Sequence, residues 1–247
     1  MSPLDLAILI VYTVVVVSVF LRAIKSFKNK KVTIALNSDR LKESLEQQNL
    51  QDQVEVKFKF DKQYAVDALP KTLALSLVNN SSQIIHVDWD SSTIMRPGER
   101  SRRVIRLTPY KSPDLSQAQA VSAVAPNSTL QEQVTAEDAL APSEDNPEIL
   151  EPAKPLVELQ VPQKPAKRAP RWVMSAKAKP GPPKPIQDFQ QVMSGKPIVF
   201  SMYLFMRATG RLTETDSDSA PQTGSQTYVI HCEFHINRCL WQDTVPW

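Results

Sequence analysis

Residues Leu73–Leu107 constrain the fold more than any other part of the sequence. Two short apolar runs, Leu73–Val78 and Ile84–Trp89, flank a polar Asn-Asn-Ser-Ser quartet, and a third run, Arg103–Leu107, follows a Pro-Gly turn signal. Short runs rich in β-branched and aromatic residues, separated by turn-forming residues, are typical of β-strands. The stretch contains no catalytic motif, so it predicts β-structure and indicates no reaction.

The composition argues against several function classes. With 5 glycines and neither a GxGxxG nor a GxxxxGK[ST] pattern, the chain lacks the glycine-rich loops that hold phosphates. A net charge of +3 does not indicate a dedicated nucleic-acid binder. The 3 histidines assemble into no specific Ser-His-Asp pattern. We therefore expect a protein that is not an enzyme, with no cofactor, no nucleic-acid partner and no small-molecule substrate.

Near the N-terminus, Leu6–Leu21 is an almost continuous apolar run. Sixteen helical residues cover about 24 Å, short of the roughly 30 Å hydrocarbon core, but Leu4 and Ala23-Ile24 extend the run and Arg22 can snorkel. The run predicts a transmembrane helix within 1–31. A signal peptide and a buried hydrophobic helix are the alternatives, although the first five residues carry no Lys or Arg and no A-x-A site follows.

A basic flank follows the apolar run. It predicts a cytoplasmic C-terminal domain and contact with the lipid bilayer, because positive charge accumulates on the cytoplasmic side of membrane spans. The flank consists of Arg22, Lys25, Lys28, Lys30 and Lys31.

Next in the chain, a short strand at Val32–Leu36 and an amphipathic helix are expected, with Ser38 as the helix N-cap. The spacing of Leu41 and Leu45 is helical. In Val54–Phe60, apolar residues alternate with Glu and Lys, which predicts a strand with one buried and one solvated face.

Proline density sets apart residues 141–188, where 11 of the 20 prolines lie. Since each proline removes an amide donor and fixes φ, we expect a disordered insertion here. Its basic half surrounds an aromatic residue and is a candidate contact for an acidic protein or lipid surface, the alternative being a solvated linker. The candidate contact residues are Lys164, Lys167, Arg168, Arg171 and Trp172.

The chain on both sides of the insertion is expected to form one domain. Residues 32–140 would supply the first part, and 189–247 a C-terminal hairpin made of Phe200–Met206 and Tyr228–Ile236. A two-stranded hairpin alone is marginally stable in water, so it needs the earlier strands. The expected fold is mainly β: a single antiparallel, Ig-like β-sandwich with one N-terminal transmembrane helix and a disordered Pro-rich insertion.

Two charged groups within the central stretch allow alternative interpretations. Asp88, Asp90 and Ser91-Ser92 could ligate Ca²⁺, but we favour a structural role in which Trp89 fills the core and the polar side chains cap a loop. A basic cluster follows. It is either a solvated face or a surface for anionic lipid or an acidic partner. Its candidate contact residues are Arg100, Arg102 and Arg103.

On the last predicted strand, His231, Glu233 and His235 share one face. Residues four apart on a strand are about 13 Å apart, too far for one metal ion, so no metal site is predicted. Cys232 points to the core, and a disulfide with Cys239 is not expected.

The segment Ile85–Ser92 (IHVDWDSS), followed by Ser101–Ile105 (SRRVI), resembles small bacterial β-sandwich domains that are mostly membrane-tethered or lipoproteins. A later Pro-Asn-Ser step at 126–128 and the last two strands are similar too. The chain departs from that pattern in lacking a lipobox cysteine and in carrying the long insertion. The resemblance implies a β-sandwich without catalysis and identifies no ligand.

Together these features predict a non-catalytic, single-pass protein of a bacterial inner or internal membrane. It would act as an accessory, scaffold or assembly subunit, with other membrane protein subunits as partners. The alternative is a membrane-tethered domain that senses a ligand or a metal.

Overall fold

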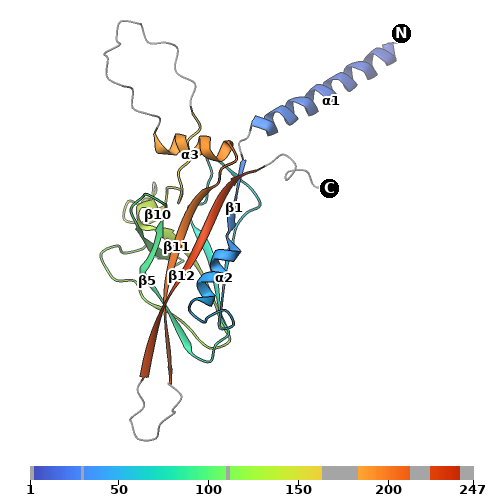
Figure 1. Cartoon of the computed structure of the whole chain (residues 1–247). Helices are drawn as coiled ribbons and strands as arrows, with labels where there is room; N and C mark the ends of the chain where they lie inside the picture. The colour runs from blue at the N-terminus through green and yellow to red at the C-terminus, as the bar shows by residue number, and fades with distance from the viewer. Residues whose placement is uncertain (1–2, 29–30, 110–111, 163–182, 212–222, 240–247) are drawn as a thin grey trace, which may run out of the picture.

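The computed structural model describes residues 3–28, 31–109, 112–162, 183–211 and 223–239 (Figure 1). The helices are α1 (Pro3–Lys28), α2 (Ser38–Glu46) and α3 (Lys184–Met193), with one 3₁₀ turn at Glu137–Ala139. The strands are β1 (Lys31–Leu36), β2 (Val54–Lys59), β3 (Tyr64–Ala65), β4 (Leu73–Asn79), β5 (Ile84–Met95), β6 (Arg102–Leu107), β7 (Ser122–Val124), β8 (Ser128–Ala136), β9 (Leu140–Pro142), β10 (Leu150–Pro152), β11 (Ile198–Arg211) and β12 (Thr223–Arg238).

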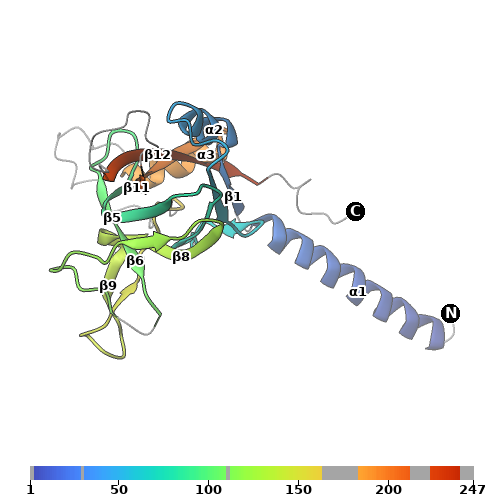
Figure 2. The ribbon, with the colours of Figure 1, turned by 90° about the horizontal axis from the view of Figure 1, so that it is seen from below.

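The fold is mainly β and antiparallel, as predicted. Hydrogen bonds connect the strands in the order β2-β4-β8-β6-β5-β11-β12-β1-β3, with β7 also paired to β5 and with β9 and β10 forming a separate pair. In place of the expected Ig-like sandwich of separate sheets, the structure has one sheet that curls over on itself (Figure 2). Its two layers are the two halves of a continuous sheet, which remain connected through β6.

Aromatic side chains close the curled sheet around its core. Phe58 of β2 meets Phe234 of β12 edge to face with ring centroids 4.8 Å apart, and Phe200 of β11 stacks on Phe234 at the same distance. β2 lies at one end of the strand order and β12 near the other, so these contacts join the two halves. Edge-to-face and offset-stacked ring pairs add to the stability that burial of the rings provides.

The alternation of apolar and charged residues gives the strands that the sequence predicts. In β2, Val54 and Val56 are buried, and Glu55, Lys57 and Lys59 are exposed. The predicted hairpin is present, since β12 pairs antiparallel with the whole length of β11, and β11 also pairs with β5.

Helix α2 completes the edge of β12 where β1 ends. Ser44 Oγ accepts the His231 amide at 2.9 Å, and Gln48 Oε1 accepts the Val229 amide at 2.8 Å. The helix N-cap is Asn37, one residue before the predicted Ser38, because the Asn37 side chain accepts the Arg40 amide. The side chains of α2 and of Gln48, two residues after its end, thus take the place of a neighbouring strand.

The structure corrects the expectation that all of 141–188 is a disordered insertion. Residues 141–162 include the β9–β10 pair, and Leu156, Val157 and Leu159 are buried in the core. Prolines leave the amides of other residues available, and those amides are bonded: Leu156 N donates to Pro70 O and Gln160 N to Pro185 O, both at 3.1 Å. The last of these bonds joins the two flanks of 163–182, a segment outside the described residues.

Helix α1 extends away from the β-domain (Figures 1 and 2). Within the described residues no helix has both the length and the apolar character needed to cross a bilayer. The large apolar side chains between Ile8 and Val19 are exposed, with exposed fractions from 47% to 67%. The transmembrane helix therefore stays a prediction from the sequence.

The packing of residues 153–160 can be tested with Leu156→Ala. Leu156 is 2% exposed and lies beside Leu69, Phe200 and Ile236. We expect its truncation to lower the free energy of unfolding by about 2–5 kcal/mol in urea titrations. The exposed neighbour Glu158→Ala should change it by less than about 0.5 kcal/mol. Equal, negligible effects of the two variants would mean that the segment does not pack on the core.

Candidate functional site

The predicted Asp-Trp-Asp-Ser-Ser motif forms a bulge in β5. Tyr203 of β11 pairs with Thr93 and Phe205 pairs with Asp88, so the four residues Trp89–Ser92 face Leu204 alone. Before the bulge the free side of β5 pairs with β7, and after it with β6. Bulges bend a strand and re-aim its side chains. At the bulge, the strand that pairs with this side of β5 changes from β7 to β6.

The side chains of the motif stabilise this bulge. Asp88 Oδ1 accepts the Ser91 amide at 3.1 Å, and Ser92 Oγ donates to Asp88 O at 2.6 Å and accepts the Phe205 amide at 3.0 Å. Trp89 is 1% exposed, and its indole N–H donates to Ser122 Oγ at 2.9 Å. Trp89 fills the core, as predicted, whereas the Asp and Ser side chains bond the backbone of a bulge within β5 and not of a connecting loop.

The other carboxylate of the motif also has internal partners. Asp90 accepts the backbone amide of Gln119 at 2.8 Å and its side-chain amide at 3.1 Å. No group of three or more His, Cys, Asp or Glu residues in the described part of the chain is arranged to hold a metal ion.

The structure places two of the three predicted arginine contacts in internal ion pairs. Arg102 bonds to Leu156 O at 2.9 Å and to Asp138 at 3.3 Å. Arg103 lies 3.3 Å from Glu137 and 3.6 Å from Asp90 and donates to Leu115 O. These two guanidinium groups therefore hold loops together, and Arg100 is exposed. Their contact with a partner or with lipid stays a prediction.

Most of the remaining predicted contact residues cannot be placed. Lys164, Lys167, Arg168, Arg171, Trp172 and Lys30 lie outside the described residues. Arg22, Lys25 and Lys28 belong to α1, where their side chains are not described. Lys31 begins β1 and donates to Gln63 Oε1 at 2.9 Å.

An ion-pair cluster with the buried pair Arg96–Asp188 at its centre joins α3 to the turn between β5 and β6. Arg96 lies 2.6 Å from Asp188 and 3.2 Å from Glu99, and Lys184 lies 2.7 Å from Glu99. Partial burial raises the pKa of Glu99, but the bond from Lys184 and the charge of Arg96 outweigh it, so the pKa is lower than usual. The sequence analysis missed Asp188, because it lies 92 positions from its partner.

The polar face of β12 is likewise paired internally. His231 stacks on Tyr203 with centroids 4.6 Å apart and bonds to Ser201 Oγ, and Glu233 Oε1 bonds to Asn37 Nδ2 at 2.7 Å and to His235 Nε2 at 2.9 Å. Burial by itself would raise the pKa of Glu233. The hydrogen bonds from Asn37 and His235 together have a larger effect in the opposite direction, so the pKa lies below its ordinary value.

Cys232 lies on the opposite, core-facing side of β12. It is fully buried, and burial raises the pKa of its thiol to about 12. A thiol that stays protonated at neutral pH is a poor nucleophile. Cys232 and Cys239 form no disulfide with each other. Cys232 is therefore a core residue, as the alternation predicts.

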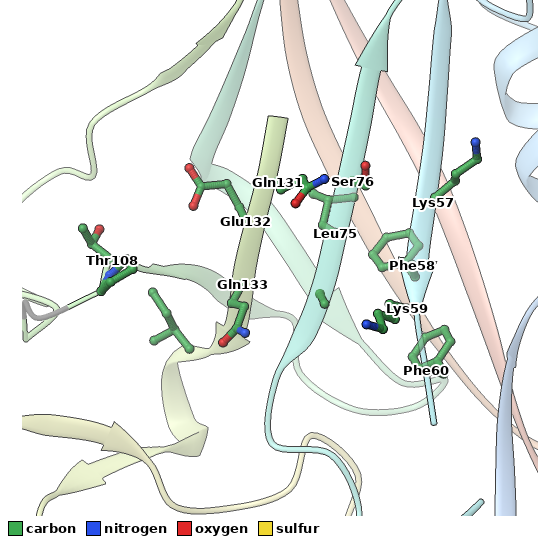
Figure 3. A pocket seen from close by; sticks show the side chains of 13 residues that line it. Lys57, Phe58, Lys59, Phe60, Leu75, Ser76, Thr108, Gln131, Glu132 and Gln133 are labelled. Carbon is green, nitrogen blue, oxygen red and sulfur yellow. The ribbon is translucent and has the colours of Figure 1, made fainter. Parts of the chain in front are cut away.

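A surface trough of about 1050 Å³ lies on the β-domain (Figure 3). β2, β4 and β8 and the segment 107–109 line it. The sequence analysis did not find it, because its residues come from four separate stretches that only the strand register brings together. The residues that line it are Lys57, Phe58, Lys59, Phe60, Ala74, Leu75, Ser76, Leu107, Thr108, Pro109, Gln131, Glu132 and Gln133.

Comparisons with known proteins add no assignment. No protein-family model matches the chain, and neither a curated protein nor a solved structure matches it significantly. The resemblance to small bacterial β-sandwich domains stays a prediction.

The ion pair at α3 should contribute strongly to stability. In Asp188→Asn, Arg96 would keep a buried charge without its nearest counter-charge, and we expect a loss of about 3 kcal/mol in urea unfolding. Asp138→Asn makes the same change in a pair whose carboxylate is 53% exposed, and should cost less than about 1 kcal/mol. Similar losses in both variants would contradict a special role for the α3 pair.

The carboxylate of Glu233 should make stability depend on pH. Its pKa is lower in the folded chain than the ordinary 4.5, so its stabilising effect is present above pH 4.5 and is lost as the pH falls through the folded value. Glu233→Gln should be less stable than the parent at pH 7, and this difference should shrink below pH 4. Urea midpoints measured across this range would refute the prediction if the two curves stayed parallel.

Proposed function

We propose that this chain is a non-catalytic accessory, scaffold or assembly subunit of a membrane protein complex. In this proposal α1 attaches it to a bilayer, and the β-domain contacts other subunits on the cytoplasmic side. A bacterial inner or internal membrane is the expected location.

The observation that carries the proposal is the apolar surface of α1. Exposed aliphatic side chains along Ile8–Val19 lie on a helix that extends away from the β-domain. A continuous apolar surface of this kind is unfavourable in water and calls for an apolar environment. The basic residues after the apolar run favour the cytoplasmic side for the β-domain.

The β-domain supports a binding role in a different way. The charged and polar groups that most resemble a reactive or metal-binding site are Asp88, Asp90, His231, Glu233 and His235, and each bonds within the protein. Such groups hold strands and loops in place. We therefore assign the function to surfaces that contact partners and not to a reaction.

The test is extraction from the native membrane in mild detergent, followed by native electrophoresis and identification of co-migrating proteins. The parent chain should resist alkaline carbonate and migrate with other subunits at stoichiometric amounts. Val11→Arg with Val15→Arg should release it into the soluble fraction, because each Arg costs about 2.5–3.5 kcal/mol at the centre of a membrane helix.

Lys42→Glu is the control, since Lys42 is exposed on α2 and its change should alter neither behaviour. A parent chain that carbonate extracts would contradict membrane attachment. A chain that stays in the membrane but migrates alone would contradict the subunit role and favour a tethered sensor.

A further inference from the structure

The trough is built from two rows of side chains that run across neighbouring strands. The register places Lys57, Ser76 and Gln131 in one row. The second row is formed by Lys59, Ala74, Gln133 and Leu107. The alternation of each strand puts both rows on the face opposite the buried Leu75 and Leu77, so they lie outside the core.

The shape of the trough follows from the small residues on β4. The register puts Ala74 and Ser76 between longer side chains on β2 and β8, which form the walls. Figure 3 shows Ser76 with Lys57 of β2 and Gln131 of β8 on its two sides. The walls are two strand spacings apart, about 10 Å. A polypeptide in extended conformation can lie along β4 between them. The volume of about 1050 Å³ is at the upper limit for small-molecule sites, which agrees with an elongated ligand.

Four polar side chains of the trough make no bond within the described part of the protein. Within the described residues, the side chains of Lys59, Ser76, Gln131 and Gln133 make no hydrogen bond or ion pair, whereas the side chain of Gln119, outside the trough, makes three hydrogen bonds. Gln side chains offer both a donor and an acceptor, as a peptide backbone requires. The trough therefore presents available hydrogen-bonding groups along an extended path.

The charged side chains of the trough indicate the charge of the ligand that would bind there. Lys57 is compensated by Glu55 at 2.7 Å, whereas Lys59 has no counter-charge among the described residues. The carboxylate of Glu132 is turned to Arg106 at 3.2 Å and is mostly buried. A positive charge without a free carboxylate beside it complements an acidic ligand.

We propose that this trough binds an extended, acidic segment of a partner protein, which lies along β4. The segment would place carboxylates near Lys59 and its backbone near the Gln131 and Gln133 amides. Main-chain hydrogen bonds and side-chain pockets recur in the recognition of extended peptides. The inference rests on the proposed function only in assuming that the chain has a protein partner.

The test uses the full-length chain in detergent micelles and a fluorescein-labelled, end-capped peptide of five Glu-Thr repeats. Fluorescence anisotropy should show saturable binding. A benzophenone placed at the centre of the peptide should cross-link to β2, β4 or β8, as located by mass spectrometry. The matching Lys-Thr peptide should not compete.

Matched variants separate the trough from general electrostatic attraction. Lys59→Glu should weaken binding at least about tenfold, since it reverses the charge at the site. Gln131→Ala with Gln133→Ala should also weaken it, without any change in charge. Lys42→Glu, which makes the same charge reversal on α2, should leave binding unchanged. Urea midpoints equal to the parent's would show that each variant is folded.

Several results would overturn the proposal: no binding, equal weakening by Lys42→Glu, competition by the Lys-Thr peptide, or tighter binding of a single-stranded DNA oligonucleotide. None of these would change co-migration of the chain with membrane subunits, so the proposed function would stand. Conversely, peptide binding by a chain that migrates alone in its membrane would refute the subunit role and leave the trough assignment intact.

Discussion

The bulge at Trp89–Ser92 is the feature on which the continuity of the sheet depends. β5 pairs with β11 along one side, and on the other it pairs first with β7 and then with β6. The change of neighbour occurs at the bulge, where Asp88 and Ser92 satisfy backbone groups that no strand reaches. From β6 the sheet continues to β8, β4 and β2, so without this transfer the two halves would not enclose a common core.

In the described part of the β-domain, most polar side chains that the sequence analysis singles out bond to this framework. Asp90 and Arg103 hold the loop before β7, Arg96 and Asp188 hold α3, and α2 bonds the edge of β12. This use of charge leaves few candidates for binding. Lys59, Gln131 and Gln133 of the trough, whose side chains make no bond within the described residues, are candidates of this kind.

Local patterns predict much of this fold, and contacts between distant residues explain the rest. Alternation in 54–60 and 227–237 predicts β2 and β12, and the Pro-Gly signal predicts the turn in which Gly98 has a φ of +76°. Proline content alone could not show that Leu156 packs on the core, since that contact depends on strands far along the chain. The trough could not be predicted from local sequence patterns either, because the register between strands brings its residues together.

The hydrogen bond from Gln160 to Pro185 has a consequence for how the chain could be divided. It brings the two flanks of 163–182 together, while β11 and β12 are held by pairing with β5 and β1. Covalent continuity through 163–182 is thus not what keeps the hairpin in the sheet. The residues before 163 and those after 182 are thus two complementary fragments. We expect the two fragments to stay associated without a covalent link if the chain is cut between them, as in a split reporter.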